Sequence, residues 1–312
     1  MQHQAHAGRM QHHWSPWQLY ADRSWSWSAS AQLIGEFSHL ETQCCGRVDD
    51  LTTEQVCSDL FPALHRLGAH IRHQLGPQGL GIAKITGLPT RPSLIATASV
   101  ATGLVVGNIL EPYGRLYSLY DRGGCYRSQA IPVSQTGKPI DFHTDSARRD
   151  VVPDAISLSC VRDAVGGNTR LVSMARVYER LLTQSHDTID RLHQSYIRAI
   201  VTPGQSRSQE NLLANQFPIF SADHESRKLT FRYMRYWIEK GQHLAGQPID
   251  PWTHDALNWL DETLRDPALY YELHLNPGEI MWVDNRDIAH ARTPHVDTDS
   301  SSRLLYRMWL TL

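Results

Sequence analysis

The sequence predicts a mainly β protein of the α+β class, with helices flanking the sheets. Short segments rich in β-branched and aromatic residues dominate the second half, whereas apolar residues at helical spacing dominate the first. No internal repeat and no low-complexity linker divides the 312 residues. We therefore expect an N-terminal arm and packing segment over residues 1–50 and a single domain over residues 51–312.

The first half is expected to contain a helix, a strand and a second, buried helix. Apolar residues recur at helical spacing from Leu51 to Gly76, with Thr52 or Thr53 as the N-cap. The segment from Gly79 to Pro89 alternates apolar and small residues between glycines and a proline, which predicts a strand. The segment from Leu94 to Leu110 is apolar but interrupted by polar residues and glycines. It is too short and too polar to span a bilayer, so we expect a buried helix.

The second half predicts short strands interrupted by two helices. The expected strands are bounded by proline, glycine or aspartate turns and run from Ala155 to Val161, Phe217 to Phe220, Lys228 to Tyr233 and Arg303 to Leu312. A hairpin turn is expected from Ala222 to Ser226. The helices are expected from Met174 to Leu182 and from Thr253 to Leu264.

The composition argues against several functional classes. The chain has 30 basic and 32 acidic side chains and a formal net charge of -2, unlike a protein that binds nucleic-acid backbones. Its five cysteines are an odd number without framework spacing, which favours a reducing compartment. The start lacks the basic and apolar regions of a secretory signal, so we expect a cytoplasmic protein, and its four histidines before Trp14 are expected to form a polar arm. The oligomeric state is not indicated.

A His-x-Asp pair marks the first candidate site. If the segment from Ile140 to Asp145 is a strand, His143 and Asp145 share a face because side chains at i and i+2 point the same way. Such a pair is two thirds of the facial triad of two histidines and one carboxylate that holds non-heme Fe(II). A second pair, His295 and Asp297, lies in a polar run and is expected to be a solvent-exposed loop.

The last strand places two arginines on one face. Alternation puts Arg303, Leu305, Arg307 and Trp309 on the same side, which is otherwise apolar. Buried guanidiniums need anionic partners, and no acid lies on this strand, so ligand carboxylates are the expected partners. Acids from neighbouring strands remain the alternative.

The C-terminal segment resembles a known enzyme family. It contains Pro-Gly-Glu at 277–279, an apolar strand, Asp-Asn-Arg at 284–286, His290 and two arginines four positions apart. Together with Phe-His-Thr-Asp at 142–145 and Gly-Gly-Asn-Thr at 166–169, this resembles the TauD/TfdA and clavaminate synthase-like branch of Fe(II)/2-oxoglutarate dioxygenases. The resemblance covers roughly residues 79–312 and implies a double-stranded β-helix, a cupin-like jelly-roll.

The same resemblance implies the site and the reaction. His143, Asp145 and His290 would bind Fe(II), Arg303 with Thr169 would bind the distal carboxylate of 2-oxoglutarate, and Arg307 would meet an anionic group of the substrate. The enzyme would use O2 to oxidise, most simply to hydroxylate, a C–H bond of a small anionic metabolite and would convert 2-oxoglutarate to succinate. We expect the substrate to be an amino acid or a derivative from a biosynthetic pathway.

Strand geometry supports a separate anion at Arg307. Its Cα is expected to lie roughly 13 Å from that of Arg303, too far for one dicarboxylate bound at iron to reach both easily. A protein carboxylate is the competing partner, for example Glu111, Asp141 or Asp223.

Several alternatives stay open. The same oxidant could desaturate or cyclise its substrate, and a non-catalytic jelly-roll that binds a metal or ligand is a second class of function. A zinc hydrolase is disfavoured because no H-E-x-x-H motif is present.

Three further features have two interpretations each. Asn285 could cap a turn, which we favour, or bond near the iron. Arg148 and Arg149 could belong to a lid or to a solvated loop, and the segment 231–237 could line a pocket or pack in the core.

Overall fold

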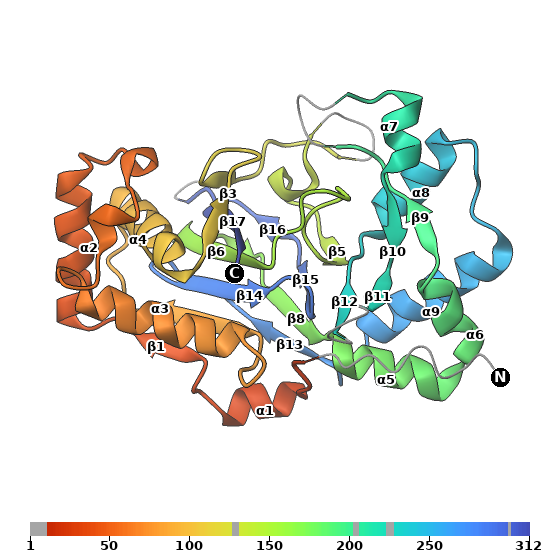
Figure 1. Ribbon diagram of the computed structural model, residues 1–312, viewed down its shortest axis with the longest axis horizontal. Coiled ribbons are helices and arrows are strands. Elements are labelled where there is room, and N and C mark those ends of the chain that lie inside the picture. Colours follow the sequence, from red (N-terminus) through yellow and green to blue (C-terminus); the bar gives the residue numbers. More distant parts are fainter. Residues whose placement is uncertain (1–10, 127–130, 202–205, 223–227, 299–300) are drawn as a thin grey trace.

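The computed structural model describes residues 11–126, 131–201, 206–222, 228–298 and 301–312 (Figure 1). A larger sheet has the strand order β1-β2-β14-β6-β17-β3, with β4 also paired to β17. Its strands are β1 (Ser26–Ser28), β2 (Ile82–Thr86), β3 (Asn108–Leu110), β4 (Tyr117–Leu119), β6 (Ala155–Arg162), β14 (Ile280–Asp284) and β17 (Leu304–Thr311).

A smaller sheet faces the larger one and has the order β13-β8-β15-β5. Its strands are β5 (Ile140–His143), β8 (Thr169–Ser173), β13 (Tyr270–Leu273) and β15 (Ile288–Arg292). Three short pairs complete the described strands: β7 (Val165–Gly166) with β16 (His295–Val296), β9 (Ser195–Ile197) with β10 (Gln216–Pro218), and β11 (Phe220–Ala222) with β12 (Leu229–Phe231). The predicted jelly-roll with flanking helices is confirmed.

Helices cover the outer faces of both sheets (Figure 1). The first half of the chain contributes α1 (Pro16–Ala21), α2 (Ala31–Gln43), α3 (Pro62–Leu75) and α4 (Pro92–Val106). The second half contributes α5 (Met174–Gln184), α6 (His186–Leu192), α7 (Gln209–Ala214), α8 (Arg235–Leu244) and α9 (Pro251–Leu264). No helix in these ranges is long and apolar enough to cross a membrane.

Strand alternation divides the core into layers. Along β17, Met308 and Leu310 face α4 and the other helices of the first half, whereas Leu305 and Trp309 face the space between the sheets. A third cluster packs the outer face of the smaller sheet against α5 and α9. Side chains on the inner faces therefore meet in one interior, and the arginines of the last strand are directed there.

The expected buried helix is confirmed as α4, which contacts the larger sheet and buries most of its length. It ends before Gly107, where a Cβ would lie 2.2 Å from the carbonyl oxygen of Thr311. Only glycine permits this approach, so the chain turns there into β3.

The first predicted helix begins later than expected. Residues from Pro62 form α3, while Glu54–Val56 form a separate 3-10 turn and Leu60 is 66% exposed. Proline lacks the N–H that would continue an earlier helix and disfavours helical geometry at Phe61, so it starts the helix at its first position.

Two predicted strands of the second half are shorter than expected. The segment from Phe217 to Phe220 divides between β10 and β11, and β12 occupies only part of Lys228 to Tyr233. Residues 223–226 of the predicted hairpin turn lie outside the described residues.

The expectation of a polar N-terminal arm is wrong for His12, which is 1% exposed. Its Nε2 lies 3.1 Å from Oδ2 of Asp284, and the ring packs on Gly81, whose φ of +72° and missing Cβ allow the contact. Burial opposes a charge on this imidazole, but the hydrogen bond and charge of Asp284 raise the pKa of His12 above its usual value.

His12, Asp284 and Asp287 bring their ligand atoms within 4.8 Å of one another. Lys228 Nζ lies 3.9 Å from both carboxylates. Arg286 also lies near Asp284, at 4.0 Å, so the two acids face His12 and two basic side chains, and the cluster fastens the N-terminal segment to the turn between β14 and β15.

Replacing His12 should test this contact. His12→Ala leaves the buried carboxylate of Asp284 without its hydrogen-bonded partner, so we expect the free energy of unfolding in urea to fall by about 3–5 kcal/mol. The adjacent His13 pairs with Glu179 at the surface, with side chains 45% and 59% exposed. His13→Ala should therefore cost less than about 1 kcal/mol. Equal losses in the two variants would contradict the buried ion pair.

Candidate active site

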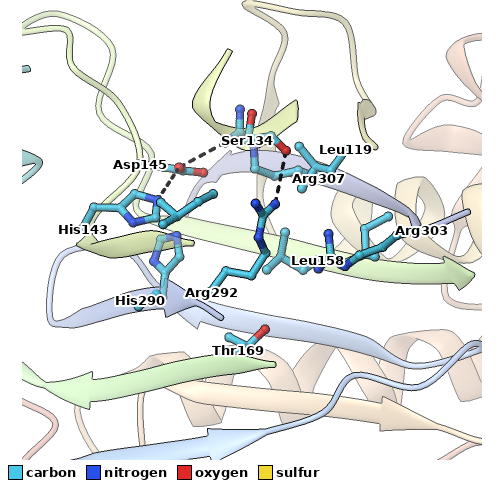
Figure 2. Close-up of a pocket in the computed structure, with 13 residues that line it drawn as sticks. Leu119, Ser134, His143, Asp145, Leu158, Thr169, His290, Arg292, Arg303 and Arg307 are labelled. Atoms are coloured by element: carbon cyan, nitrogen blue, oxygen red, sulfur yellow. Dashed lines mark hydrogen bonds and ion pairs between the residues drawn. The ribbon is translucent and has the colours of Figure 1, made fainter. Parts of the chain in front are cut away.

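The cavity between the two sheets contains every site residue that the sequence predicts (Figure 2). His143, Asp145 and His290 lie at one end and Arg303 lies at the other, while Thr169 lines the cavity below Arg292. Leucine side chains from β4, β6 and β17 form much of the wall. Charged groups in such surroundings interact strongly and need partners.

A β-bulge directs His143 into this cavity. His143 pairs with His290 of β15, whereas Ile140 pairs with Arg292, so β5 carries one extra residue between the two pairs. Both Ile140 and His143 consequently line the cavity. The Nδ1 of His143 lies 2.8 Å from the carbonyl oxygen of Asp141, which leaves Nε2 directed toward Asp145 at 3.8 Å.

Asp145 follows the end of β5 and is held from several sides. Its Oδ1 accepts a hydrogen bond from Nη1 of Arg307 at 3.1 Å, and its Oδ2 accepts one from Nε1 of Trp309 at 2.8 Å. The backbone turns immediately afterwards at Ser146, which has a φ of +77°. The predicted convergence of His143 and Asp145 is confirmed.

Asn285 fixes the main chain of Asp145. Its Oδ1 accepts from the Asp145 N–H at 2.7 Å, and its Nδ2 donates to the carbonyl oxygens of Asp145 and Pro153 at 3.1 and 3.2 Å. The sequence interpretation favoured a simple turn cap and was wrong, because the side chain bonds the strand end that carries a candidate metal ligand.

His290 completes the group from the middle of the smaller sheet. Its strand, β15, pairs with both β5 and β8, and its ring centroid lies 4.3 Å from that of His143. Its Nδ1 is buried and has no hydrogen-bond partner in the described part of the chain. One ligand atom from each of His143, Asp145 and His290 lies within 4.8 Å of the others.

The electrostatics suit a cation. Burial lowers the pKa of His290 to about 3, helped by His143, and burial also lowers the pKa of His143. Burial alone would raise the pKa of Asp145, but the charge of Arg307, followed by the two histidines, holds it below its usual value. At neutral pH the site therefore presents two neutral imidazoles and one carboxylate.

These residues fit the metal that the sequence implies. Two imidazoles and a carboxylate are the donor set of non-heme Fe(II), and the unpartnered nitrogen of His290 shows that the protein alone leaves a ring atom unsatisfied. His143, Asp145 and His290 would hold the ion, and no other residue of the described chain lies in this group.

Arg303 lies at the far end of the cavity and is 6% exposed. It forms no ion pair with any described residue. Gly167 approaches it so closely that a Cβ would lie 3.0 Å from Nε, at a φ of +70° that also favours glycine. Together with Arg307 and Leu305 it lines one cavity, so the predicted shared face is confirmed.

The expectation that a ligand carboxylate would neutralise Arg307 is wrong, and the alternative, an acid of the protein, is what the structure contains. Arg307 pairs with Asp145, which was not among the competing acids considered. Of those acids, Glu111 pairs with Arg115 and Asp141 with Arg265, and residue 223 lies outside the described residues. The carboxylate comes from the end of a strand in the opposite sheet, a contact that alternation within one strand cannot reveal.

Sequence reasoning missed Arg292 and misplaced His295. Arg292 is two positions after His290 on β15 and lines the same cavity, so the period-two rule applied to His290 would have found it. His295 is 5% exposed, not solvent-exposed as expected, because β16 pairs with Gly166 of β7. Burial and the nearby Arg292 and Arg303 lower the pKa of His295 to about 4.

The structure also bears on the two remaining segments with open interpretations, the loop that contains Arg148 and Arg149 and the segment 231–237. Arg148 pairs with Asp150, and the Arg149 N–H bonds the side chain of Asn215, so this loop is held against α7 and β9. In segment 231–237, Phe231 and Tyr233 pack in the core, whereas residues 234–236 line a separate polar cavity outside β5.

Known proteins share this fold and sequence pattern. The family model described as taurine catabolism dioxygenase TauD, TfdA family matches residues 80–309. The FR-33289 synthase of Streptomyces rubellomurinus is 25% identical over 250 residues, which cover 75% of this chain and 70% of the synthase. The L-asparagine oxygenase of Streptomyces coelicolor is 25% identical over 308 residues, covering 90% of this chain and 87% of the oxygenase.

A solved structure is similar over nearly the whole chain. The structure of an asparagine oxygenase in complex with Fe(II), 2S,3S-3-hydroxyasparagine and succinate has a TM-score of 0.71 and 21% identity, with coverage of 92% of this chain and 93% of that chain. The likeness confirms the fold.

Loss of the Asn285 side chain should weaken metal binding. Asn285→Ala removes the two hydrogen bonds that fix the main chain of Asp145 and a third to Pro153, so we expect the dissociation constant for Fe(II), measured by anaerobic titration, to rise about 10- to 100-fold. Asn211→Ala, the same change at an exposed site on α7, should leave it unchanged. An unaltered Fe(II) affinity in Asn285→Ala would show that Asp145 keeps its position without the hydrogen bonds of Asn285.

Proposed function

The chain belongs to the taurine catabolism dioxygenase TauD, TfdA family, and from this membership we propose the roles of its site residues and the class of its substrate. It is an Fe(II)- and 2-oxoglutarate-dependent oxygenase. We propose that His143, Asp145 and His290 bind the iron and that Arg303, with the hydroxyl of Thr169, binds the distal carboxylate of 2-oxoglutarate. The substrate is a small amino acid or an amino-acid derivative that becomes hydroxylated.

One observation carries the assignment of the site. The three-residue ligand group and a buried arginine without an ion pair in the described chain lie at opposite ends of one cavity. A dicarboxylate could chelate a metal with one end and bind a guanidinium with the other, so it fits a cavity with a metal-ligand group at one end and a buried arginine at the other. Arg binds carboxylates bidentately, and the low polarity of the walls strengthens the pair.

Iron bound at this site would supply the oxidation, in which the substrate, O2 and 2-oxoglutarate give the hydroxylated substrate, succinate and CO2. The protein itself provides the metal ligands, orients Asp145 and excludes water. Two neutral imidazoles and one carboxylate leave positions open for the cosubstrates, while Arg307 and Trp309 keep Asp145 ionised and oriented. The leucines of the cavity exclude water from the reacting atoms.

The substrate proposal rests on Arg307 and on the relatives. Arg307 uses only Nη1 to bond Asp145, so its other nitrogens have no acceptor among the described residues, and the residue lines the same cavity as the proposed metal ligands. A substrate carboxylate there would lie next to the iron. One of the relatives is an L-asparagine oxygenase, whose named substrate carries such a group.

Turnover of His290→Ala tests the proposed metal site. Without this ligand, bound iron and succinate formation from 2-oxoglutarate should both be lost, as measured by metal content and by product analysis with candidate amino acids. His295→Ala changes another buried histidine outside the ligand group and should retain iron. Full activity of His290→Ala together with loss of activity in His295→Ala would reverse the ligand assignment.

Arg307→Lys tests the proposed substrate contact. Lysine keeps the charge near Asp145 but loses the planar fork, so the Michaelis constant for the amino-acid substrate should rise much more than the one for the cosubstrate, 2-oxoglutarate. Arg162→Lys, at an exposed position of β6, should change neither constant. A neutral analogue turned over as well as the carboxylate substrate would remove Arg307 from this role.

A further inference from the structure

We propose that Arg292 is a second guanidinium for the distal carboxylate of 2-oxoglutarate, acting beside Arg303. The inference rests on the proposed function and deepens it. Arg292 is 9% exposed and lines the cavity together with Arg303 and Thr169. In Figure 2 its side chain lies between His290 at the metal end and Arg303 at the far end.

The hydrogen bonds of Arg292 account for its outer nitrogens but not for its charge. Nη2 donates to the carbonyl oxygens of Thr136 and, at 2.6 Å, Lys138, and Nη1 donates weakly to that of Ser134 at 3.5 Å. Its Nε is buried without any acceptor in the described chain. Backbone carbonyls accept hydrogen bonds but carry no net charge, so the positive charge of Arg292 remains uncompensated.

No described carboxylate supplies the missing charge. Asp121 is close enough to favour the charged form of Arg292 but forms no ion pair with it, and Asp297 bonds the main-chain N–H of Arg303 instead of its guanidinium. Arg292 and Arg303 therefore share one cavity as two like charges, and no carboxylate of the described chain forms an ion pair with either guanidinium.

A carboxylate at this end of the cavity would offset both charges. It has two oxygens, each able to accept more than one hydrogen bond, so two guanidiniums and a threonine hydroxyl can share it. This is the position where the dicarboxylate must end if its other end lies at His143, Asp145 and His290. The free Nε of Arg292 is the donor that the protein leaves available.

The competing explanation is that Arg292 only fastens the wall at 134–138. A wall anchor would affect every 2-oxo acid equally, whereas a carboxylate ligand would discriminate between acids. We therefore compare 2-oxoglutarate with 2-oxopentanoate, which has a methyl group in place of the distal carboxylate. Binding of each acid to the anaerobic Fe(II) enzyme is followed by its absorbance change.

Arg292→Met should weaken the binding of 2-oxoglutarate and raise its dissociation constant roughly 10- to 100-fold, the loss expected for a charged hydrogen bond. The dissociation constant for the analogue, 2-oxopentanoate, should change less than about twofold. Arg303→Met should show the same selectivity. Arg170→Met, on the neighbouring strand but paired with Glu272, should leave both constants unchanged.

Arg292→Lys keeps a cation if the methionine variant does not fold. Its preference for 2-oxoglutarate over 2-oxopentanoate should still fall severalfold, because lysine cannot donate in the same fork. An unchanged preference in the folded Arg292 variants would overturn the role of Arg292 alone. A wild-type enzyme that binds neither acid would overturn the proposed function, and this inference with it.

Discussion

The buried carboxylate of Asp145 is the group on which the site depends. It is 6% exposed, and a carboxylate in such surroundings is stable only where charged or hydrogen-bond donors surround it. Arg307 and Trp309 supply those donors from β17 of the larger sheet, whereas β5 of the smaller sheet carries the chain to the carboxylate. One charged group therefore links the two sheets at the end of the cavity where a metal would bind.

The turn between β14 and β15 holds the same group from its main-chain side and connects the two sheets. Asn285 bonds the backbone of Asp145, while Asp284 and Asp287 at the ends of the turn contact the N-terminal segment through His12 and Gln11. The described part of the N-terminal segment has no residue in the cavity, yet through this turn it contributes to the position of a candidate metal ligand.

Local periodicity predicted which residues share a face but not which groups meet across the fold. Arg303 and Arg307 were placed correctly on one side of a strand because alternation is a property of that strand alone. The Asp145 partner of Arg307 lies 162 positions away, and His295 is buried only because its strand pairs with a distant one. The sequence does contain a signal for the start of α3, because proline favours the first position of a helix and Pro62 occupies it. The apolar spacing that begins at Leu51 predicted an earlier start and was misleading.

The cavity contains more arginines than acids, and this excess of positive charge affects how it binds a metal. Three guanidiniums, Arg292, Arg303 and Arg307, face one carboxylate, Asp145, and the histidines are neutral, which leaves an excess of two positive charges. A metal dication alone would add to that excess and bind less favourably. A dianion that enters the same cavity offsets two of the resulting four positive charges, so the metal and the dianion each stabilise binding of the other. The excess of arginines is therefore suited to a site that binds its metal together with anionic ligands.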